Sequence, residues 1–314
     1  MEASWNAAVR HLKGCRLCGN ECNADRSVSG SNVCEASEQA EVAWMGVHHG
    51  EEPPISGTRG CGNIFFLHCS MACVYCQNWQ ISSRISHEIE PVQYTEGRLA
   101  DEMLRLQEAG VHTLGLVGAT PHLLTVVPAL VQARLRGLQI PVVYNSGGYD
   151  SVESIQMLDG LVDVYLPDMK YGSDAVARVY SGVPRYVSTN RLCVQEMARQ
   201  VGPLILDGQG IARRGLLIRH LILPGGLADT EDVLGWIARN LGADVHLSLM
   251  SQYKPSFQIV EGLYPELNRT LTEDEYSYYL YVAQGLGFRN LYTQELSSCN
   301  VYNPDFTSQE PFVT

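Results

Sequence analysis

The sequence lacks the long apolar segments that mark membrane and exported proteins. No apolar run reaches the roughly 18 residues that a membrane-spanning helix requires. The first residues, MEASWNAAVRHLKG, contain no apolar core of the kind found in secretion signals. Internal repeats and low-complexity tracts are also missing. From these absences we expect a cytoplasmic protein without a membrane partner.

Basic residues are scarce as well. The chain has 22 Lys and Arg against 34 Asp and Glu, a formal net charge of −12. Nucleic-acid binding needs a basic surface that neutralises phosphates, so we expect no nucleic-acid partner. Residues 178–219 are an exception, with seven arginines against two acids. Such a stretch is typical of a solvated face, and the alternative is an arginine-bearing opening for an anionic substrate or an acidic partner.

Cysteine, in contrast, is plentiful, with ten residues in the chain. Disulfides rarely persist in the cytosol, so these thiols are better explained by metal binding or redox chemistry. Seven of them fall into two closely spaced groups, one near the N-terminus and one at residues 69–76.

The pattern of apolar residues predicts an α/β fold with a parallel sheet. Six segments are apolar almost throughout, which is typical of strands buried on both faces, and helical patterns separate them. Regular alternation of this kind implies right-handed crossovers, and about six strands predict a partial (β/α)6 barrel. The strand segments are 62–68, 111–118, 140–146, 162–169, 215–224 and 244–253.

Some helix ends can also be predicted. A helix that ends before Gly110 should bury Leu99, Met103 and Leu106 on one face. We expect Thr120 to cap the next helix, because Pro121 suits the first helical position.

We divide the chain into three parts. Residues 1–60 form a cysteine-bearing extension followed by a loop, residues 61–255 form the barrel, and residues 256–314 form a C-terminal helix and tail that pack on it. In the last part, Thr272 and Glu275 form a capping box, which predicts a helix that runs to about Gly285.

The segment FFLHCSMACVYCQNWQIS, residues 65–82, contains three cysteines with the spacing Cys69-x3-Cys73-x2-Cys76. A structural zinc ion would need four ligands. Three thiolates can instead hold three irons of a 4Fe–4S cluster and leave the fourth iron for a ligand that is not protein. The motif follows a buried strand, at the end of the barrel where such folds place their chemistry. We therefore predict a catalytic cluster with one iron open to a substrate or cofactor.

This spacing resembles the signature of the radical S-adenosylmethionine (SAM) enzymes. The resemblance implies that the open iron binds the amino and carboxylate groups of SAM. One electron then cleaves SAM to a 5′-deoxyadenosyl radical, which abstracts a hydrogen atom. The resemblance also places Tyr75 near the adenine, and it implies an electron donor such as flavodoxin or ferredoxin.

Further segments are similar to the PflX-type branch of that family, which is related to pyruvate formate-lyase activating enzyme. These blocks run from residue 15 to about 255, so the resemblance covers most of the chain. It implies the cofactor chemistry more firmly than the substrate. The segments are HHGEEPPISG, VYNSGGYDS, DVYLPDMKY, RGLLIRHLILPG and LMSQYKP.

The resemblance points to residues that would contact SAM. Where the family has a Gly-Gly-Glu-like stretch, Gly118, Ala119 and Thr120 would act through backbone and hydroxyl groups. Asn145 and Ser146 would lie near the ribose.

Two charged segments complete the expected site. Asp168 and Lys170 match an Asp-Leu-Lys segment and would contact SAM, with Lys170 paired to a carboxylate; an ordinary ion pair at a strand end is the alternative. Arg219 matches the arginine of the family and is expected to face the barrel interior. His220 then points to the opposite face, where a packing role is expected.

The N-terminal group consists of Cys15, Cys18, Cys22 and Cys34. Four thiols in two pairs suit either a tetrahedral zinc ion or a second iron–sulfur cluster. Because the group precedes the SAM motif, we favour a structural zinc site and keep the cluster as the alternative.

Other residues near the motif allow two interpretations each. Cys61 is a candidate hydrogen donor or radical quencher, and the alternative is a small buried apolar residue. Cys193 is expected in the core, and Cys299 has no interpretable context. Residues 48–52, HHGEE, are expected either to cover the cluster opening or to form a loop held by hydrogen bonds.

These observations predict a radical SAM enzyme that acts on a small molecule or a peptide. One alternative is an activase that abstracts hydrogen from a backbone glycine of a glycyl-radical partner protein. We favour the first because the matched strands depart from the activating enzymes at two SAM-contact positions. The remaining alternative is a non-catalytic iron–sulfur or zinc protein, which would need Cys61 as a fourth cluster ligand.

Overall fold

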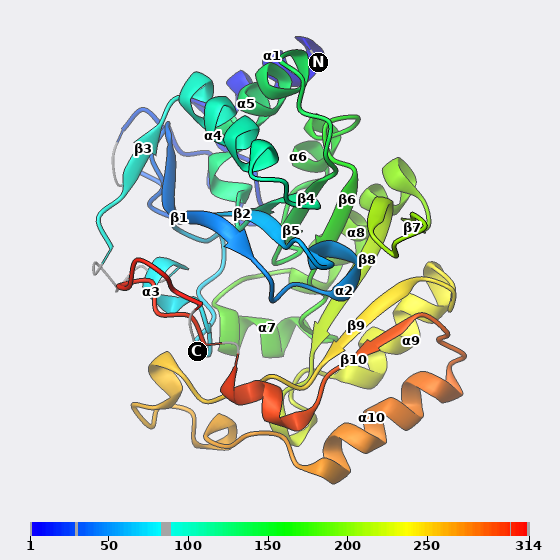
Figure 1. The fold of residues 1–314 in the computed structure, drawn as a ribbon. Coiled ribbons are helices and arrows are strands. Elements are labelled where there is room, and N and C mark those ends of the chain that lie inside the picture. Colours follow the sequence, from blue (N-terminus) through cyan, green and yellow to red (C-terminus); the bar gives the residue numbers. More distant parts are fainter. Residues whose placement is uncertain (1, 29–30, 83–88, 302, 313–314) are drawn as a thin grey trace.

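The computed structural model describes residues 2–28, 31–82, 89–301 and 303–312 (Figure 1). In this part of the chain ten strands form one sheet with the order β10-β9-β8-β6-β5-β4-β2-β1-β3, and β7 pairs with β8. The strands are β1 (Ala40–His48), β2 (Cys61–Phe66), β3 (Val92–Tyr94), β4 (Thr113–Val117), β5 (Val142–Ser146), β6 (Val164–Pro167), β7 (Ile205–Leu206), β8 (Ala212–Leu221), β9 (His246–Met250) and β10 (Leu291–Thr293).

The centre of the sheet confirms the predicted α/β fold. The six expected strands are β2, β4, β5, β6, β8 and β9, and each pairs in parallel with the next one in this order. All residues of β2, β5 and β6 are buried, because strands covered on both faces need apolar side chains in both directions. The short strand β10 adds a seventh parallel strand beside β9.

The outer part of the sheet contains a strand that we did not predict. Residues 40–48 were expected to be loop, but they form β1, which runs antiparallel to β2 and pairs with β3 on its other side. Its sequence, AEVAWMGVH, is buried at its start and only half-buried further on, as befits a strand near a sheet edge. The N-terminal extension therefore contributes directly to the sheet.

Helices cover the sheet and connect its strands. In Figure 1 the helices between the central strands lie outside the curved sheet, and α4 packs on α5 while α6 packs on α8. No described helix is both long and apolar enough to cross a membrane. The helices are α1 (Glu2–Arg10), α2 (Pro53–Ser56), α3 (Trp79–Ser82), α4 (Glu96–Glu108), α5 (Leu123–Leu135), α6 (Val152–Met157), α7 (Asp174–Ser181), α8 (Tyr186–Val201), α9 (Thr230–Asn240) and α10 (Glu273–Gly285).

The predicted helix ends agree with the structure in two cases and differ in one. Helix α4 buries the expected apolar face, and α10 begins with the complete capping box and ends at Gly285. Thr120, however, does not cap α5. It opens a short 3₁₀ turn, and its hydroxyl donates to the buried carboxylate of Asp150 at 2.7 Å. The carboxylate of Asp150 is a strong acceptor for the hydroxyl proton, and neither the 3₁₀ turn nor α5 has a side-chain cap hydrogen bond.

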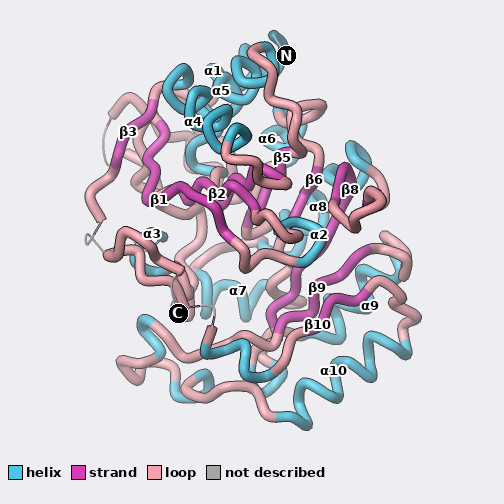
Figure 2. Tube along the Cα trace, viewed as in Figure 1, coloured by secondary structure: helices cyan, strands magenta, loops and turns pink. Residues whose placement is uncertain are grey.

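The chain after β10 is mostly loop and returns to the cysteine motif (Figure 2). A short 3₁₀ helix, Leu296–Asn300, begins this segment. Further along the tail, the backbone N–H of Phe306 donates to Gln80 Oε1 at 2.9 Å, and the amide of Gln80 donates to Asp305 Oδ1 at 3.1 Å. The C-terminal tail is thereby held against α3, directly beyond the last cysteine of the motif.

Candidate active site

The cysteine motif lies in the loop that follows β2. Two backbone hydrogen bonds fix this loop to the end of α7: Ala72 N–H donates to the carbonyl of Ser181 at 3.0 Å, and Val74 N–H donates to that of Tyr180 at 2.9 Å. The three cysteines are therefore presented at the carboxyl edge of the parallel strands, as the sequence predicts.

Each cysteine of the motif has a hydrogen-bond partner. The backbone N–H of Met71 reaches Cys69 Sγ at 3.4 Å, and the Ser82 hydroxyl reaches Cys76 Sγ at 3.1 Å. The third partner is Ser181, whose Oγ lies 2.9 Å from Cys73 Sγ. Donors at such positions stabilise negative charge on sulfur, so they suit thiolates that ligate a cluster.

The Ser181 hydroxyl is the end of a buried chain of hydroxyl groups. Its Oγ lies 2.6 Å from the Tyr171 hydroxyl, which lies 2.6 Å from that of Tyr75. If Cys73 is a thiolate it can only accept, so Ser181 donates to Cys73, Tyr171 donates to Ser181 and Tyr75 donates to Tyr171. Every hydroxyl dipole in the chain then points toward Cys73, and aligned hydrogen bonds reinforce one another.

The three thiols fit an iron–sulfur cluster better than a single ion. Burial raises the pKa of Cys69 to about 12 and that of Cys73 to about 11, so a bound metal must displace their protons. Among the described residues, no three Cys, His, Asp or Glu side chains are grouped closely enough to hold one ion. A 4Fe–4S cluster does not need such a grouping, because each cysteine ligates a different iron.

Charged residues form a line beside the motif. Lys170 Nζ lies 2.5 Å from Asp168 Oδ2, and Arg219 Nε lies 3.0 Å from Asp168 Oδ1. Burial alone would raise the pKa of Asp168, but the charges of Lys170 and Arg219 outweigh it and lower that pKa. Lys170 is also close enough to Cys73 to lower the pKa of its thiol. A cation therefore lies between the motif and the buried carboxylate.

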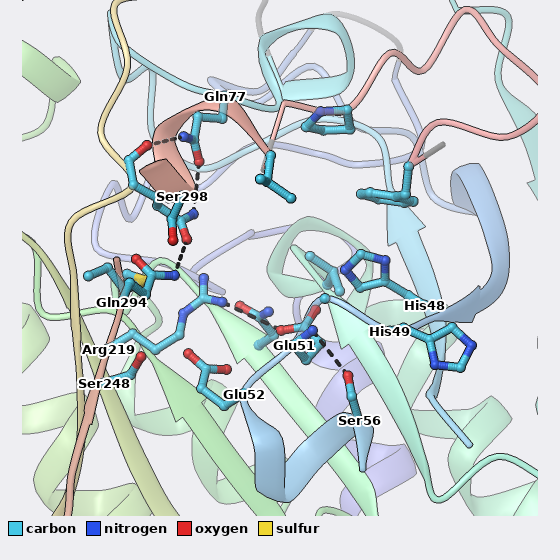
Figure 3. A pocket seen from close by; sticks show the side chains of 18 of the residues that line it. His48, His49, Glu51, Glu52, Ser56, Gln77, Arg219, Ser248, Gln294 and Ser298 are labelled. Atoms are coloured by element: carbon cyan, nitrogen blue, oxygen red, sulfur yellow. Dashed lines mark hydrogen bonds and ion pairs between the residues drawn. The ribbon is translucent and has the colours of Figure 1, made fainter. Parts of the chain in front are cut away.

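A large cavity of about 1090 Å³ lies inside the curved sheet. Gln77 and Asn78, which follow the last cysteine, line it together with residues from β1, β2, β4, β5, β8, β9 and β10. The amide of Gln77 is paired with that of Gln252 at 3.1 Å, and Gln294 donates to Gln252 at 2.6 Å (Figure 3). These amides tie the motif loop to the ends of β9 and β10.

The loop that carries His48–Glu52 extends into this cavity. Asn63, on β2, donates to Glu51 Oε1 at 2.8 Å, and the backbone N–H of Glu51 donates to Ser56 Oγ at 3.1 Å. Arg219 Nη1 lies 3.6 Å from Glu51 Oε2 (Figure 3). The loop is thus held by hydrogen bonds, one of the two expected arrangements, and it brings two acids to the wall of the barrel interior.

The residues expected near SAM separate into two places. Asn145 lines the cavity, whereas Ser146 points to the other face of β5 and donates to Asp150 at 2.8 Å. The hydroxyl of Thr120 is bonded to the same carboxylate. Side chains of consecutive strand residues point to opposite faces, so Asn145 and Ser146 cannot both point into the cavity.

Gly118 and Ala119 lie in the turn after β4. Gly118 has a positive φ of 71°, and its N–H donates to the carbonyl of Asn145 at 3.0 Å. Ala119 is fully buried. The turn follows the same sheet edge as the motif, and its tight backbone explains the glycine.

Two other expected residues have packing positions. Cys61 is fully buried in an apolar cluster with Ile55 and Val143, and it does not line the cavity. His220 is fully buried, with Nδ1 2.6 Å from the carbonyl of Met169 and Nε2 2.9 Å from Thr230 Oγ1. Burial lowers the pKa of His220 to about 4, so it is neutral at pH 7.

The four N-terminal cysteines lie together beside the motif. They line one small cavity that also includes Ser70. Asn20 Nδ2 lies 3.6 Å from Cys18 Sγ and donates to the carbonyl of Ser70 at 2.6 Å. Arg26 Nη1 lies 3.6 Å from Cys15 Sγ. Ser70 is adjacent to Cys69 in the chain, so one asparagine links the two cysteine groups.

Several residues that shape the site carry no recognisable sequence signal. Ser181 is 108 positions from Cys73 and lies outside the segments quoted above, and the segment DVYLPDMKY, which ends at Tyr171, does not indicate a contact of this tyrosine with Ser181 or Tyr75. Asp150, which gathers the hydroxyls of Thr120, Tyr144 and Ser146, looks in the sequence like an ordinary turn residue. Only the fold shows that these residues meet.

Comparisons with known proteins agree with this arrangement. Residues 63–202 match the model of the radical SAM superfamily. An uncharacterised protein of Methanocaldococcus jannaschii, MJ0674, is 31% identical over 270 residues, which cover 84% of this chain and 72% of that protein.

Solved structures of two kinds are also similar. HydG, a maturase of the FeFe-hydrogenase, matches with a TM-score of 0.47 and 12% identity over 72% of this chain and 50% of that one. HydG of Carboxydothermus hydrogenoformans matches with a TM-score of 0.46 and 16% identity over 74% of this chain and 52% of that one. This chain therefore spans about half the length of the HydG chains. TYW1 with a lysine-pyruvate adduct bound matches with a TM-score of 0.45 and 12% identity over 74% of this chain and 76% of that one. Residues 63–202, which contain the cysteine motif, therefore belong to the radical SAM superfamily, and the chain is related to MJ0674 over most of its length.

Proposed function

We propose that this protein uses a 4Fe–4S cluster, held by Cys69, Cys73 and Cys76, to cleave SAM and to abstract a hydrogen atom from a small molecule or a peptide. The observation that carries the proposal is the continuity of the motif loop with the cavity, since Gln77 and Asn78 line it directly after Cys76. When bound, the cluster supplies the single electron for reductive cleavage of SAM, and the 5′-deoxyadenosyl radical takes the hydrogen atom.

The polar residues at this edge of the sheet have roles in binding and orientation. Lys170 offers a positive charge beside Cys73, where the carboxylate of SAM is expected, and Asp168 holds that ammonium in place. Tyr75 has a fixed ring, because its hydroxyl is bonded to Tyr171 and its ring lies edge-on to Tyr253 at 6.0 Å. A fixed ring suits the proposed contact with the adenine.

The C-terminal tail favours a small substrate. Trp44 Nε1 donates to the carbonyl of Gln309 at 3.1 Å, and the ring of Phe312 lies 5.2 Å from those of Trp44 and Phe65. These contacts place the tail across one side of the cavity. A protruding loop of a glycyl-radical protein would have to displace the tail. Activation of such a partner protein, which the resemblance to the PflX-type branch suggests, is therefore the second candidate function.

We also propose that Cys15, Cys18, Cys22 and Cys34 hold a second metal group. A zinc ion needs four sulfurs about 2.3 Å from one point. The described residues contain no such grouping, and this favours an iron–sulfur cluster over the zinc ion that the sequence order suggested. Loss of Cys18 is therefore expected to lower the iron content rather than the zinc content.

Formation of 5′-deoxyadenosine tests the proposal. Anaerobically reconstituted protein with a strong reductant and SAM should produce it, and the Cys76→Ala variant should not. The Cys61→Ala variant is the matched control and should retain the cluster, because Cys61 lies in a separate apolar cluster. Production by the Cys76 variant, or its absence from the wild type, would reject the proposal.

A further inference from the structure

Glu52 is an acid at the cavity wall with an unfilled hydrogen-bonding position. In the described structure its Oε2 atom has no hydrogen-bond partner and no contact with solvent. Figure 3 shows its carboxylate below Arg219, and a hydrogen bond from Ser248 to this carboxylate lowers the pKa of Glu52. A polar atom left in this state costs about 1–3 kcal/mol, so it marks a place where a ligand can add stability.

The nearby cation is already engaged by other acids. Arg219 lies 3.0 Å from Asp168 and 3.6 Å from Glu51, and Lys170 is paired with Asp168. Asp168, Glu51 and Glu52 thus share two cations, so the ionised form of Glu52 has no cation of its own. Burial raises the pKa of Glu52, the charge of Arg219 opposes this shift, and the neighbouring charge of Glu51 adds to it.

The other described residues that line the cavity include more acidic than basic side chains. Arg219 is its one Lys or Arg residue, whereas Glu295 and Glu310 add two acids at exposed positions. Burial lowers the pKa of His48 to about 4, so this histidine is neutral and adds no positive charge. An anionic substrate would meet repulsion here, and a cationic one would meet attraction.

An aromatic wall, formed by Trp44, His48, Phe65 and Phe312, also lines the cavity. The ring of Phe312 lies 4.1 Å from that of His48 and 5.2 Å from those of Trp44 and Phe65. Aromatic side chains provide apolar contact area, and their faces attract cations. The cavity therefore combines an acid that has one carboxylate oxygen without a partner with a group of aromatic side chains.

We propose that the cavity binds a substrate that carries a protonated amine, with the amine at Glu52 and the apolar part of the substrate on the aromatic wall. The ammonium would supply the missing positive charge, and a small rotation of the side chain would bring Oε2 to one of its N–H groups. The inference rests on the proposed function, because it names the substrate class of the same cavity.

Binding should depend on pH in a defined direction. The ionised form of Glu52 binds an ammonium, and its raised pKa means that this form is depleted on acidification. Glu51, Arg219, His48 and Tyr292 also face this region. Glu51 is paired with Arg219, His48 is neutral, and burial together with the charge of Glu52 raises the pKa of Tyr292, which keeps it protonated. Affinity for an amine should therefore increase as the pH rises through the pKa of Glu52.

The test compares phenethylamine with 2-phenylethanol, which differ in the amine alone. Their affinities for the reconstituted protein with SAM would be measured by ligand-observed NMR titration at neutral pH. We expect the amine to bind at least tenfold more tightly to the wild type. The Glu52→Gln variant should lose this preference, whereas Glu52→Asp and the rim variant Glu310→Gln should retain it.

The outcomes separate this inference from the proposed function. Equal affinities for the two compounds, no binding of the amine, or a preference that persists in Glu52→Gln would overturn the amine proposal. Cleavage of SAM would be measured on the same samples, and its failure would count against the enzyme proposal alone, since amine binding does not require cleavage.

Discussion

Substitution of Ser181 by alanine should lower the reduction potential of the bound cluster. The change removes the hydroxyl 2.9 Å from Cys73 Sγ and ends the chain through Tyr171 and Tyr75. Ser181 is fully buried, and its carbonyl would still accept from Ala72, so the loop should keep its position. The variant therefore isolates one hydrogen bond to sulfur.

The size of the effect follows from the strength of that bond. A hydrogen bond to a charged group contributes about 1.5–3 kcal/mol. Reduction adds negative charge to the cluster and its sulfur ligands, so the bond strengthens on reduction. If roughly half of the energy differs between the two states, the potential falls by about 30–60 mV, since about 59 mV corresponds to 1.4 kcal/mol for one electron.

A redox titration followed by electron paramagnetic resonance (EPR) measures this shift. Tyr171→Phe is the matched control, because it shortens the chain but keeps the direct bond from Ser181, and its shift should be smaller. An unchanged potential in Ser181→Ala, with the cluster fully assembled, would refute the assignment of Ser181 as a residue that tunes the cluster.

Three further predictions concern stability and metal content. Asp168→Asn should lower the free energy of unfolding by about 3 kcal/mol in urea, because it leaves Lys170 and Arg219 without their shared carboxylate. The pKa of Asp168 is lowered in the folded protein, so the full difference in stability should be present above pH ~4 and should fade as the pH falls through the folded pKa. A difference in stability that does not depend on pH would contradict this prediction. Thr272→Ala should destabilise by about 1 kcal/mol through loss of the cap of α10, and an unchanged unfolding midpoint would argue against that cap. Cys18→Ser should remove about four irons per chain and leave zinc unchanged, whereas loss of one zinc ion would identify the N-terminal group as a zinc site.

The sequence predicts the parts of this protein whose residues are close together in the chain. Apolar runs identify the six central strands, because a strand buried on both faces has few polar positions. The motif Cys69–Cys76 predicts a cluster site, because the proposed ligands lie within one loop. The strand β1 was missed because its apolar and polar residues do not alternate regularly. The bulge between Val42 and Trp44 shifts the register of the strand and interrupts the alternation.

Contacts between distant segments could not be predicted in the same way. The hydroxyl of Thr120 had a plausible local partner in the helix that follows it, but Asp150, thirty positions away, binds it instead. The segment with Glu51 and Glu52 was expected either to cover the cluster opening or to form a loop held by hydrogen bonds. Neither alternative predicted that Arg219 lies beside these acids. Such pairings depend on the register of the strands, which local sequence patterns do not specify.

The most direct test of the central claim is EPR spectroscopy of the reduced, reconstituted protein with and without SAM. If Cys69, Cys73 and Cys76 hold a cluster with one iron open to SAM, the signal of that cluster should shift when SAM is added, and the shift should be absent from the Cys76→Ala variant. A cluster signal that SAM leaves unchanged in the wild type would contradict the claim and indicate a protein that binds iron without radical chemistry.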